Sequence, residues 1–538
     1  MSLDASTAIK VPSRGPTTPG ALPALTIAAH PDPARVGDRA VLGELSAGRE
    51  VELSRQTLEF QRPGSPGGAP LGDPFVSRTP IRLVPATDGR IRLVRGDSTT
   101  TIEIAGLDHD TVELGPLTAG QGIPIALADR LVVVLHLIDA EDAGGLALGD
   151  DLGMVGAGSA IRRVREAITE IVDLTVPVLI RGETGTGKEL VARALHDGSP
   201  RRAGPFVSVN LAAIGKELAA AELFGAVRGA YTGAVGDREG YFRAAAGGTL
   251  FLDEIGEAPA EVQAMLLRVV ETGELYPVGG QRPIATDVRL IAATDARLEA
   301  QIEAGTFKAP LLHRLAGHEI HLPALRERPE DIGPLIHHVA REELTALGEL
   351  DKLVARDGDG DPWLPPAIAG ALVRFRWPGN VRQLRNVTRQ IVIHSRGRAQ
   401  LVLPPRLARE LEAGARSLPV ARLTTIATAP PASAVEPGKR RRPADVTEPE
   451  LLAALRARGW DVKAAADQLD IPRSSIYAIM DRCPNIRTAR DLTPDEITQA
   501  HRDSAGDLDR MAAALEVSRR ALQRRVKDLG LEIRSADA

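Results

Sequence analysis

The chain has 538 residues, 43% of them hydrophobic, so it is long enough for roughly three or four domains with real cores. Its 66 basic and 71 acidic residues give a net charge of −5, and bulk charge therefore does not indicate a nucleic-acid partner. The single cysteine, Cys483, excludes an internal disulfide framework and is typical of a reducing cytosol.

The N-terminal part of the chain predicts a tail followed by an all-β sandwich. Residues 1–24 are polar and Pro-rich, lack the charged and then apolar pattern of a leader, and are interpreted as a disordered tail. From 25 to 139, polar and apolar residues alternate in segments such as 90–93 and 101–104, which Gly, Pro and Asp separate. The apolar run 131–138 is too short to span a bilayer and contains a histidine, so it predicts a strand and no membrane association.

Three short segments of this region resemble the loops of a forkhead-associated domain. They are Leu53-Ser54-Arg55, Asp73-Pro74-Phe75-Val76-Ser77-Arg78 and Gly96-Asp97-Ser98-Thr99-Thr100. Such domains bind phosphothreonine peptides, and the resemblance implies phosphate contacts from Arg55, Ser77 and Arg78, whose guanidinium and hydroxyl groups suit a phosphate. However, Pro80 stands where the family has a structural histidine, and the usual Asn-Gly after the serine is absent. A sandwich that only packs on the rest of the chain is the alternative.

After a linker at 140–153, the pattern of a strand, a glycine-rich loop and a helix follows. The run 176–180 predicts a buried strand, and 189–196 predicts a helix. Glycines let the loop between them turn its N–H groups inward, the helix adds its positive end, and Lys188 supplies a charge for the outer phosphates. An ordinary glycine-rich turn is the alternative. The expected nucleotide contacts are Gly156, Gly182, Glu183, Thr184, Gly185, Thr186, Gly187, Lys188 and Glu189.

Two further segments lie downstream of this loop. Glycines flank a lone aromatic residue in a stretch that predicts either a mobile tip that contacts a partner or an ordinary turn. Its residues are Gly229, Ala230, Tyr231, Thr232, Gly233 and Ala234. The second segment, 249–254, predicts a hydrophobic strand that ends in two acids, of which one can hold magnesium and the other can polarise an attacking water. A buried strand with two solvated acids is the alternative. Together with the phosphate loop, however, the segment 249–254 indicates a nucleoside triphosphatase.

The block 154–403 resembles the central domain of the sigma-54-dependent transcriptional activators, which are ATPases of the AAA+ class. Family loops read Gly-Ala-Phe-Thr-Gly-Ala, so Tyr231 replaces a Phe, and family phosphate loops also carry Glu after the lysine. The other matching stretches are Gly247 to Gly256, Leu322 to Arg328 and Trp377 to Leu384. The resemblance implies an α/β P-loop ATPase fold with a helical lid at about 330–403.

The resemblance also implies roles for individual residues. Lys188 would bind the β- and γ-phosphates of ATP, Asp253 would hold Mg²⁺ and Glu254 would activate water. Asn210 resembles the asparagine that restrains this glutamate, and Arg382 matches the lid arginine that senses the nucleotide.

An arginine finger matches Arg314 and would reach the nucleotide of the neighbouring subunit. The site is then complete only in a homo-oligomeric ring, which in the family is usually a hexamer. Surface salt bridges are the alternative for this residue and for Arg382.

Two departures from the family pattern affect hydrolysis. The sensor strand usually ends in Ala-Thr-Asn, but this chain has Thr294 followed by Asp295, and an acid near the γ-phosphate repels it unless it is protonated, paired or turned away. Lys308 stands where the family often has a second arginine, and lysine lacks the planar fork of that residue. We expect hydrolysis to survive at a reduced rate.

The chain past 403 predicts a linker and a duplicated DNA-binding tail. Residues 404–446 are rich in Pro and Ala and end in a basic run. Two segments, 447–488 and 493–534, repeat each other at an offset of 46 residues, from Thr447 to Thr493. Each has the all-α pattern of a helix-turn-helix and resembles the Fis-type module of this family, although a small helical dimerisation bundle is the alternative. The expected DNA contacts are Arg473, Ser474, Ser475, Arg519, Arg520, Arg524 and Arg525.

The sequence therefore predicts a multidomain bacterial transcription activator of the cytoplasm. It would bind upstream activating DNA, hydrolyse ATP with Mg²⁺ and remodel the sigma-54 RNA polymerase holoenzyme, under the control of a phosphothreonine protein. One alternative is a regulator that binds DNA, phosphopeptide and ATP without hydrolysis. Another, a generic AAA+ remodeller, is disfavoured by the Tyr231 loop and the tail together.

Overall fold

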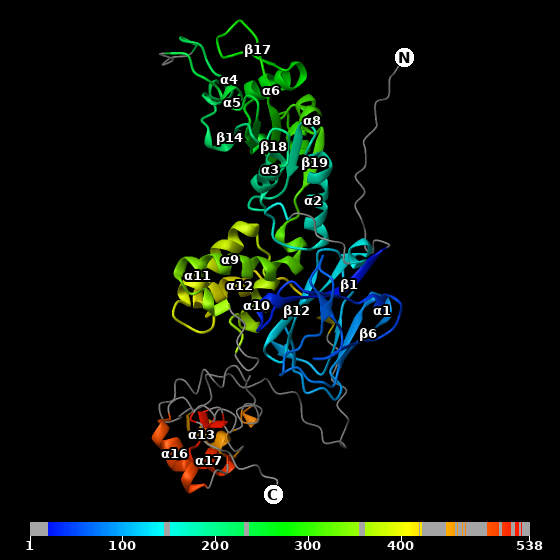
Figure 1. Cartoon of the computed structure of the whole chain (residues 1–538), viewed down its shortest axis with the longest axis vertical. Coiled ribbons are helices and arrows are strands. Elements are labelled where there is room, and N and C mark those ends of the chain that lie inside the picture. Colours follow the sequence, from blue (N-terminus) through cyan, green and yellow to red (C-terminus); the bar gives the residue numbers. More distant parts are fainter. Residues whose placement is uncertain are drawn as a thin grey trace. The chain divides into compact units, whose positions relative to one another are not determined.

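The computed structural model divides the chain into two compact units, residues 1–426 and 427–538, and each is described by itself. The structure describes residues 20–144, 151–230, 236–353, 361–418, 420–421, 448–457, 460, 465, 468–469, 492–504, 508–517, 522–523, 525–526 and 529. Figure 1 shows the elements of both units, coloured along the sequence.

The N-terminal region of the first unit consists of two sheets of antiparallel strands that enclose one apolar core. One sheet has the order β5-β4-β2-β1-β12-β11-β8-β9, and the other has the order β20-β10-β7-β6-β3. The strands are β1 (Ala21–Ala29), β2 (Arg39–Val41), β3 (Val51–Leu53), β4 (Phe60–Gln61), β5 (Gly68–Ala69), β6 (Ile81–Pro85), β7 (Ile91–Val94), β8 (Ile102–Ile104), β9 (Leu107–Asp108), β10 (Thr111–Leu114), β11 (Gly122–Leu127), β12 (Leu131–Asp139) and β20 (Val420–Ala421). Short helical segments are η1 (Pro33–Arg35), α1 (Gly43–Ser46), η2 (Thr87–Gly89) and η3 (Ala140–Gly144).

The alternating pattern of the sequence explains these strands. In β7, Ile91 and Leu93 are buried whereas Arg92 is exposed, because successive side chains of a strand point to opposite faces of the sheet. The apolar run at 131–138 is strand β12, which lies between β1 and β11 and is buried on both faces. Strand β1 already begins at Ala21, so the structure corrects the start of this region from residue 25.

The α/β core that follows is built on a parallel sheet of order β14-β15-β18-β13-β19, with helices on its faces. Its strands are β13 (Val178–Arg181), β14 (Phe206–Asn210), β15 (Thr249–Asp253), β18 (Arg289–Thr294) and β19 (His318–His321), and β16 (Glu274–Leu275) and β17 (Ile284–Ala285) form a separate hairpin. Its helices are α2 (Ser159–Ile171), α3 (Lys188–Asp197), η4 (Leu211–Ala213), α4 (Ala219–Phe224), α5 (Tyr241–Ala244), η5 (Ile255–Glu257), α6 (Ala260–Thr272), α7 (Leu298–Glu303) and α8 (Ala309–Leu315). Such a parallel sheet brings the carboxyl ends of its strands to one edge, where ligands bind.

A helical lid completes the first unit. Two short helical segments, η6 (Leu325–Glu327) and η7 (Pro329–Asp331), connect it to the α/β core, and residues 325–331 are named the connector. The lid helices are α9 (Ile332–Leu347), η8 (Leu350–Leu353), α10 (Pro366–Arg374), α11 (Asn380–His394) and α12 (Pro405–Ala413). Helix α12 corrects the boundary at 403: its Leu407 and Leu411 are buried in the lid core, so the chain does not become a linker there.

The second unit is described for parts of both repeats. Its helices are α13 (Glu448–Ala457), α16 (Pro494–Asp503) and α17 (Leu508–Ala514). In the second repeat, Ile497, Met511, Leu522 and Val526 are buried in one small core. Thr493 accepts from the backbone N–H of Glu496 while the Glu496 carboxylate accepts from that of Thr493, a capping box that fixes the start of α16.

Candidate functional site

The phosphate loop lies between β13 and α3, as the sequence predicts. Gly185 has φ +81°, and a Cβ atom at this position would lie 2.5 Å from the carbonyl oxygen of Gly379, so only glycine fits under the lid. Lys188 is the first residue of α3 and is buried; its Nζ donates to Gly182 O at 3.0 Å and lies 3.5 Å from Glu254 Oε1. The loop thus holds one cation at the N-terminal end of a helix, where anions bind.

Asp253 is the last residue of β15 and Glu254 follows it, and this strand lies two places from the phosphate-loop strand in the sheet. Asp253 accepts from the backbone N–H of Glu254 at 3.1 Å. Glu254 has φ 56° and ψ 50°, a left-handed conformation that is strained for a residue with a side chain and is common at functional sites. Burial raises the pKa of Glu254, the charge of Lys188 opposes this, and the charges of Asp295 and Asp253 add to it. A carboxylate made more basic in this way is suited to accept a proton from water.

The expected restraint by Asn210 has a different geometry in this structure. The side chain amide donates to Asp253 Oδ2 at 3.4 Å, because β14 and β15 pair with Asn210 opposite Asp253. Its Oδ1 accepts from the backbone N–H of Ala212. The residue therefore contacts the first acid, which precedes Glu254. Carboxylate oxygens are the ligands that Mg²⁺ prefers, and Asp253 at this strand end fits that use.

The acid that departs from the family pattern has a partner in the phosphate loop. Thr294 ends β18 and is buried, and Asp295 follows it. The Thr184 hydroxyl donates to Asp295 Oδ2 at 2.5 Å. The hydrogen bond satisfies one oxygen of the carboxylate and ties the loop to the sensor strand, although it leaves the negative charge in place.

Lid and connector residues that the sequence did not single out hold the phosphate loop. Asn380 Nδ2 donates to Glu183 Oε2 and to Thr184 O, both at 3.1 Å. Arg326 forms a bidentate pair with Glu183 at 2.6 and 2.7 Å, and this hydrogen bonding lowers the pKa of Glu183 to about 2. Both residues lie inside sequence stretches that match the family, and this match was the signal by which the sequence could have identified them. Arg382 donates its backbone N–H to Gly185 O at 3.3 Å, while its side chain is exposed.

Three predicted residues face solvent. Arg314 on α8 is exposed, with its Nε 3.3 Å from Glu271 Oε1. Lys308 precedes the same helix and is exposed as well. Glu189 is exposed on α3, 4.0 Å from Arg193, so in this structure it does not line the phosphate cradle.

The first predicted nucleotide contact, Gly156, lies in the segment 154–158 that precedes α2. Asp331 of the connector accepts from the backbone N–H groups of Ala157 and Gly158 with its Oδ1, each at 2.9 Å. Arg165 binds the carbonyl oxygens of Met154 and Gly156. Met154 is buried in the core that also contains residues of β13 and α3, so this segment flanks the phosphate loop.

Only the base of the predicted partner loop is described. Residues 231–235, with Tyr231, Thr232, Gly233 and Ala234, lie outside the described residues. Ala226 bridges Arg238 on the far side of the loop and Val278 of the β16–β17 connection. Arg228 also donates its N–H to Asp237 Oδ1 at 2.8 Å. The base of the loop is therefore paired and lies next to the connection between β16 and β17.

The predicted phosphopeptide residues are adjacent. Arg55 donates its backbone N–H to Ser77 O at 3.1 Å, and its side chain donates to Pro74 O. Arg78 is exposed beside them. A buried ion pair, Arg130 Nε with Asp73 Oδ2 at 3.0 Å, fixes the start of this loop. Guanidinium and hydroxyl groups thus lie at one end of the sandwich.

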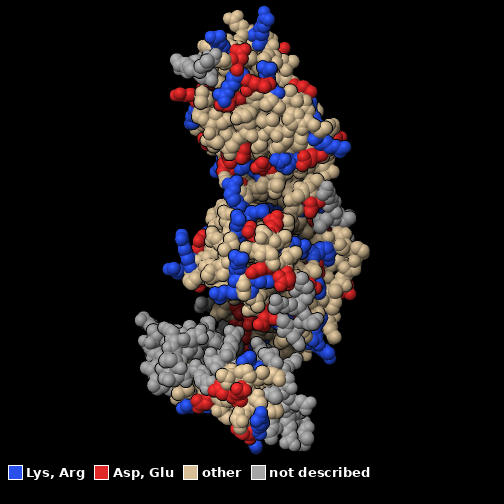
Figure 2. All heavy atoms as spheres, turned by 60° about the vertical axis from the view of Figure 1, so that its left-hand side comes forward, with Lys and Arg blue, Asp and Glu red and all other residues tan. Residues whose placement is uncertain are grey.

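The predicted DNA contacts are mostly outside the described residues, namely Arg473, Ser474, Ser475, Arg519, Arg520 and Arg524. Arg525 is described, and it donates to the backbone oxygen of Leu492 at 3.2 Å. This guanidinium therefore holds the second repeat together, which a charge pattern alone did not reveal. On the face shown in Figure 2, basic and acidic side chains are interspersed.

The described part of the chain lacks both a side-chain metal cluster and a membrane-spanning helix. No group of three or more His, Cys, Asp or Glu residues there has the arrangement of a metal cluster. No helix in the same residues combines the length and apolarity needed to cross a bilayer.

The fold and this site define a P-loop nucleotide-binding protein with a lid, and comparisons with known proteins give the family. The Sigma-54 interaction domain family matches residues 154–321, and the AAA+ ATPase lid domain family matches 326–422. The chain belongs to the sigma-54-dependent transcriptional activators of the NtrC and NorR type.

Two relatives are similar over most of their length. The DNA-binding transcriptional regulator NtrC of Azospirillum brasilense is 36% identical over 384 residues, which are 71% of each chain. The nitric oxide reductase transcription regulator NorR1 of Cupriavidus necator is 38% identical over 406 residues, 71% of this chain and 77% of that one.

Other relatives are covered less completely. NtrC of Salmonella typhimurium is 46% identical over 279 residues, which are 52% of this chain. The chain thus spans 57% of the length of that relative. Among solved structures, NtrX from Brucella abortus in complex with ADP is 28% identical over 71% of this chain and 70% of that one, with a TM-score of 0.43.

Proposed function

We propose that this protein is an ATP-dependent activator of transcription that acts on the sigma-54 RNA polymerase holoenzyme. One observation carries the proposal: Lys188 Nζ lies 3.5 Å from Glu254 Oε1, at the edge where the phosphate loop and the acids of β15 meet. A cation for the phosphates and a base for water are thus adjacent. Family membership supports the same conclusion, since the matching domain is named for its interaction with sigma-54.

In this proposal, ATP binding changes the partners of Lys188. Its ammonium group leaves Gly182 O and Glu254 and binds the β- and γ-phosphates. Glu254 is then free to accept a proton from the attacking water, and its raised pKa favours this step. Asp253 would hold Mg²⁺, which when bound neutralises charge that develops on the phosphates.

The exposed Arg314 supports a shared site in a ring, for which a hexamer is proposed. Its guanidinium has one partner at the surface, Glu271, and is accessible to a neighbouring protomer. A mixture of Arg314→Ala and Lys188→Ala protomers should recover hydrolysis, since one intact site forms between two defective chains. If the mixture is as inactive as its parts, the finger does not act in trans.

The two flanking regions would supply location and signal. The C-terminal repeats are proposed to bind upstream activating DNA, which a footprint on such DNA would detect. The loop with Arg55, Ser77 and Arg78 is proposed to bind a phosphothreonine protein, because its hydroxyl and guanidinium groups are adjacent. In a titration with phosphothreonine peptides, Arg55→Ala should lose binding and Arg82→Ala, an exposed arginine of β6, should keep it.

The decisive experiment separates hydrolysis from transcription. Tyr231→Ala should leave ATP hydrolysis intact and abolish transcription from a sigma-54 promoter, because the tip of the loop transmits the force. Tyr231→Phe, which restores the family residue, should keep both activities. Transcription by Tyr231→Ala at the wild-type level would refute the assignment of this loop.

A second function has specific support. Asp295 adds a negative charge near the phosphates, and Lys308 replaces a forked side chain, so the chain could bind ATP and DNA without turnover. A phosphate-release assay decides between the two functions. Release of phosphate that Lys188→Ala abolishes supports the ATPase, and its absence at every protein concentration supports the non-hydrolysing regulator.

A further inference from the structure

The N-terminal sandwich and the lid share a continuous apolar core. Ala28 and Val132, from the central strands β1 and β12, are buried together with side chains of α9, α10 and α11. Gly333 of α9 approaches β1 so closely that a Cβ atom would lie 2.5 Å from both the Cα and the carbonyl oxygen of Ala28. Gly122 of β11 approaches Pro329 of the connector in the same way. The sandwich therefore packs directly against the lid and the connector.

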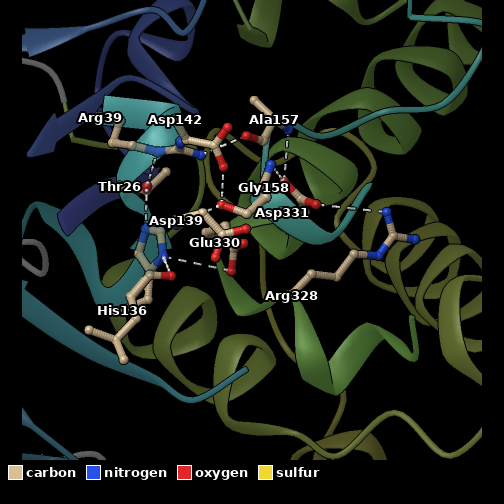
Figure 3. Close-up of polar contacts among 12 residues, drawn as sticks. Thr26, Arg39, His136, Asp139, Asp142, Ala157, Gly158, Arg328, Glu330 and Asp331 are labelled. Carbon is tan, nitrogen blue, oxygen red and sulfur yellow. Dashed lines mark hydrogen bonds and ion pairs between the residues drawn. The ribbon is translucent and has the colours of Figure 1, made fainter. Parts of the chain in front are cut away.

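The connector lies where sandwich, ATPase core and lid meet. Its Arg326 binds Glu183 of the phosphate loop, and its Asp331 binds the N–H groups of Ala157 and Gly158. Its Glu330 is buried, with Oε2 3.9 Å from His136 Nδ1 of β12. The connector thus contacts the phosphate loop as well as the segment 154–158 and the sandwich, and Figure 3 shows the last two of these contacts.

The sandwich also contacts the segment 154–158 directly. Arg39, on β2, is 7% exposed, and its Nη2 donates to Ala157 O at 2.8 Å. Its Nε donates to Thr26 Oγ1 at 3.4 Å, and that hydroxyl is hydrogen-bonded to His136 Nε2 at 2.8 Å. Figure 3 shows Arg39, Thr26 and His136 in line from the segment to the connector.

The contacts at Ala157 fix the peptide from both sides. Asp331 accepts from its N–H and Arg39 donates to its carbonyl, so the two charged side chains hold one residue between them. Hydrogen bonds from charged groups are about twice as strong as neutral ones. The neighbouring α2 is attached as well, because Asp139 donates its backbone N–H to Ser159 Oγ at 3.1 Å and Asp142 pairs with Arg162.

We propose that Arg39 of the sandwich is a positioning residue for nucleotide binding. It holds the segment 154–158 in the conformation that meets an adenine nucleotide seated on the phosphate loop, and this rests on the proposed function of that loop. A shift of β2 against the connector would then alter nucleotide affinity directly, so the sandwich has a physical route to the site.

The test measures nucleotide affinity in the full chain. Arg39→Ala should raise the Kd for a fluorescent ADP, and the KM for ATP, about tenfold, while kcat stays within about twofold. Arg39→Lys, which keeps a charged donor, should recover part of the affinity. Arg82→Ala, which removes an exposed arginine of the same sandwich, should match the wild type.

Other outcomes distinguish the possible failures. Unchanged Kd and KM in Arg39→Ala would refute the proposal, and so would a loss of kcat with a lower melting temperature but the same Kd. If Arg39→Ala does not fold, Thr26→Val, which removes the hydroxyl that accepts from Arg39 Nε and is hydrogen-bonded to His136, must still raise the Kd. If Lys188→Ala binds ADP as tightly as the wild type, the nucleotide site itself is wrong, whatever Arg39 does.

Discussion

The nucleotide site and the buried junction between sandwich, connector and ATPase core both contain ionisable side chains, but the surroundings of these side chains differ. At the site, Lys188 and Glu254 lie 3.5 Å apart, and either can exchange its partner for a ligand. At the junction, burial lowers the pKa of His136 to about 3 and raises that of Glu330 to about 8, so both are neutral near pH 7. The two groups of the nucleotide site can thus exchange partners with a ligand, whereas His136 and Glu330, which lie between domains, are neutral.

This contrast separates two kinds of mutational effect. A substitution at the nucleotide site should abolish ATP hydrolysis but change the free energy of unfolding little, because a bound ligand replaces the side-chain partner that was lost. A change at the junction should affect stability first, because its groups have no partner besides the protein interior. The following predictions test this contrast, beginning with the largest effect.

Lys188→Ala should reduce ATP hydrolysis at least about 100-fold, because it removes the cation that stabilises the outer phosphates. Its melting temperature should stay near that of the wild type. Lys216→Ala, which removes an exposed lysine of the same domain, is the control and should hydrolyse ATP normally. Activity in Lys188→Ala above a tenth of the wild-type rate would contradict the assignment.

Gly333→Ala should destabilise the first unit by about 2–3 kcal/mol, since a Cβ atom would overlap the backbone of Ala28. Gly370→Ala makes the same substitution in α10, where a Cβ atom meets nothing within 4 Å, and should be neutral or stabilising. Chemical denaturation followed by circular dichroism gives both values. Equal effects would mean that sandwich and lid are not closely packed.

Glu330→Gln should alter the pH dependence of stability. In the folded chain this carboxyl keeps its proton up to about pH 8, while in the unfolded chain it loses it near 4.5. Unfolding between these values releases a proton, so wild-type stability falls as pH rises, by up to ~1.4 kcal/mol per pH unit for one proton. Denaturation curves from pH 5 to 8 should show a flatter dependence in Glu330→Gln. An unchanged slope would indicate that Glu330 is ionised at the junction.

Asp295→Asn should give the smallest effect, an increase of about two- to fivefold in the rate of hydrolysis. The amide keeps a polar group beside Thr184 and removes a negative charge next to the phosphates. A phosphate-release assay at saturating ATP measures the change. A lower rate would show that the carboxylate takes part in the reaction, and that the nucleotide site uses more charges than assumed.

The sequence by itself determined the local parts of this protein. A strand, six residues of loop and a helix follow one another at 178–197, so their spacing alone specifies the phosphate cradle around Lys188. The acids 253 and 254 are equally local, because the first ends a buried strand and the second follows it. The alternation in β7 and the apolar run of β12 likewise predict strands without knowledge of their partners.

Only the tertiary structure decided which distant groups meet. Thr184 and Asp295 are 111 residues apart, and Arg39 and Ala157 are 118 apart, yet each pair is hydrogen-bonded. Arg525 was predicted as a DNA contact, and only the structure shows that its guanidinium donates to the backbone oxygen of Leu492. Local motifs need only the conformation of a few consecutive residues. Contacts between domains depend on how whole faces pack, and no single stretch of sequence encodes that.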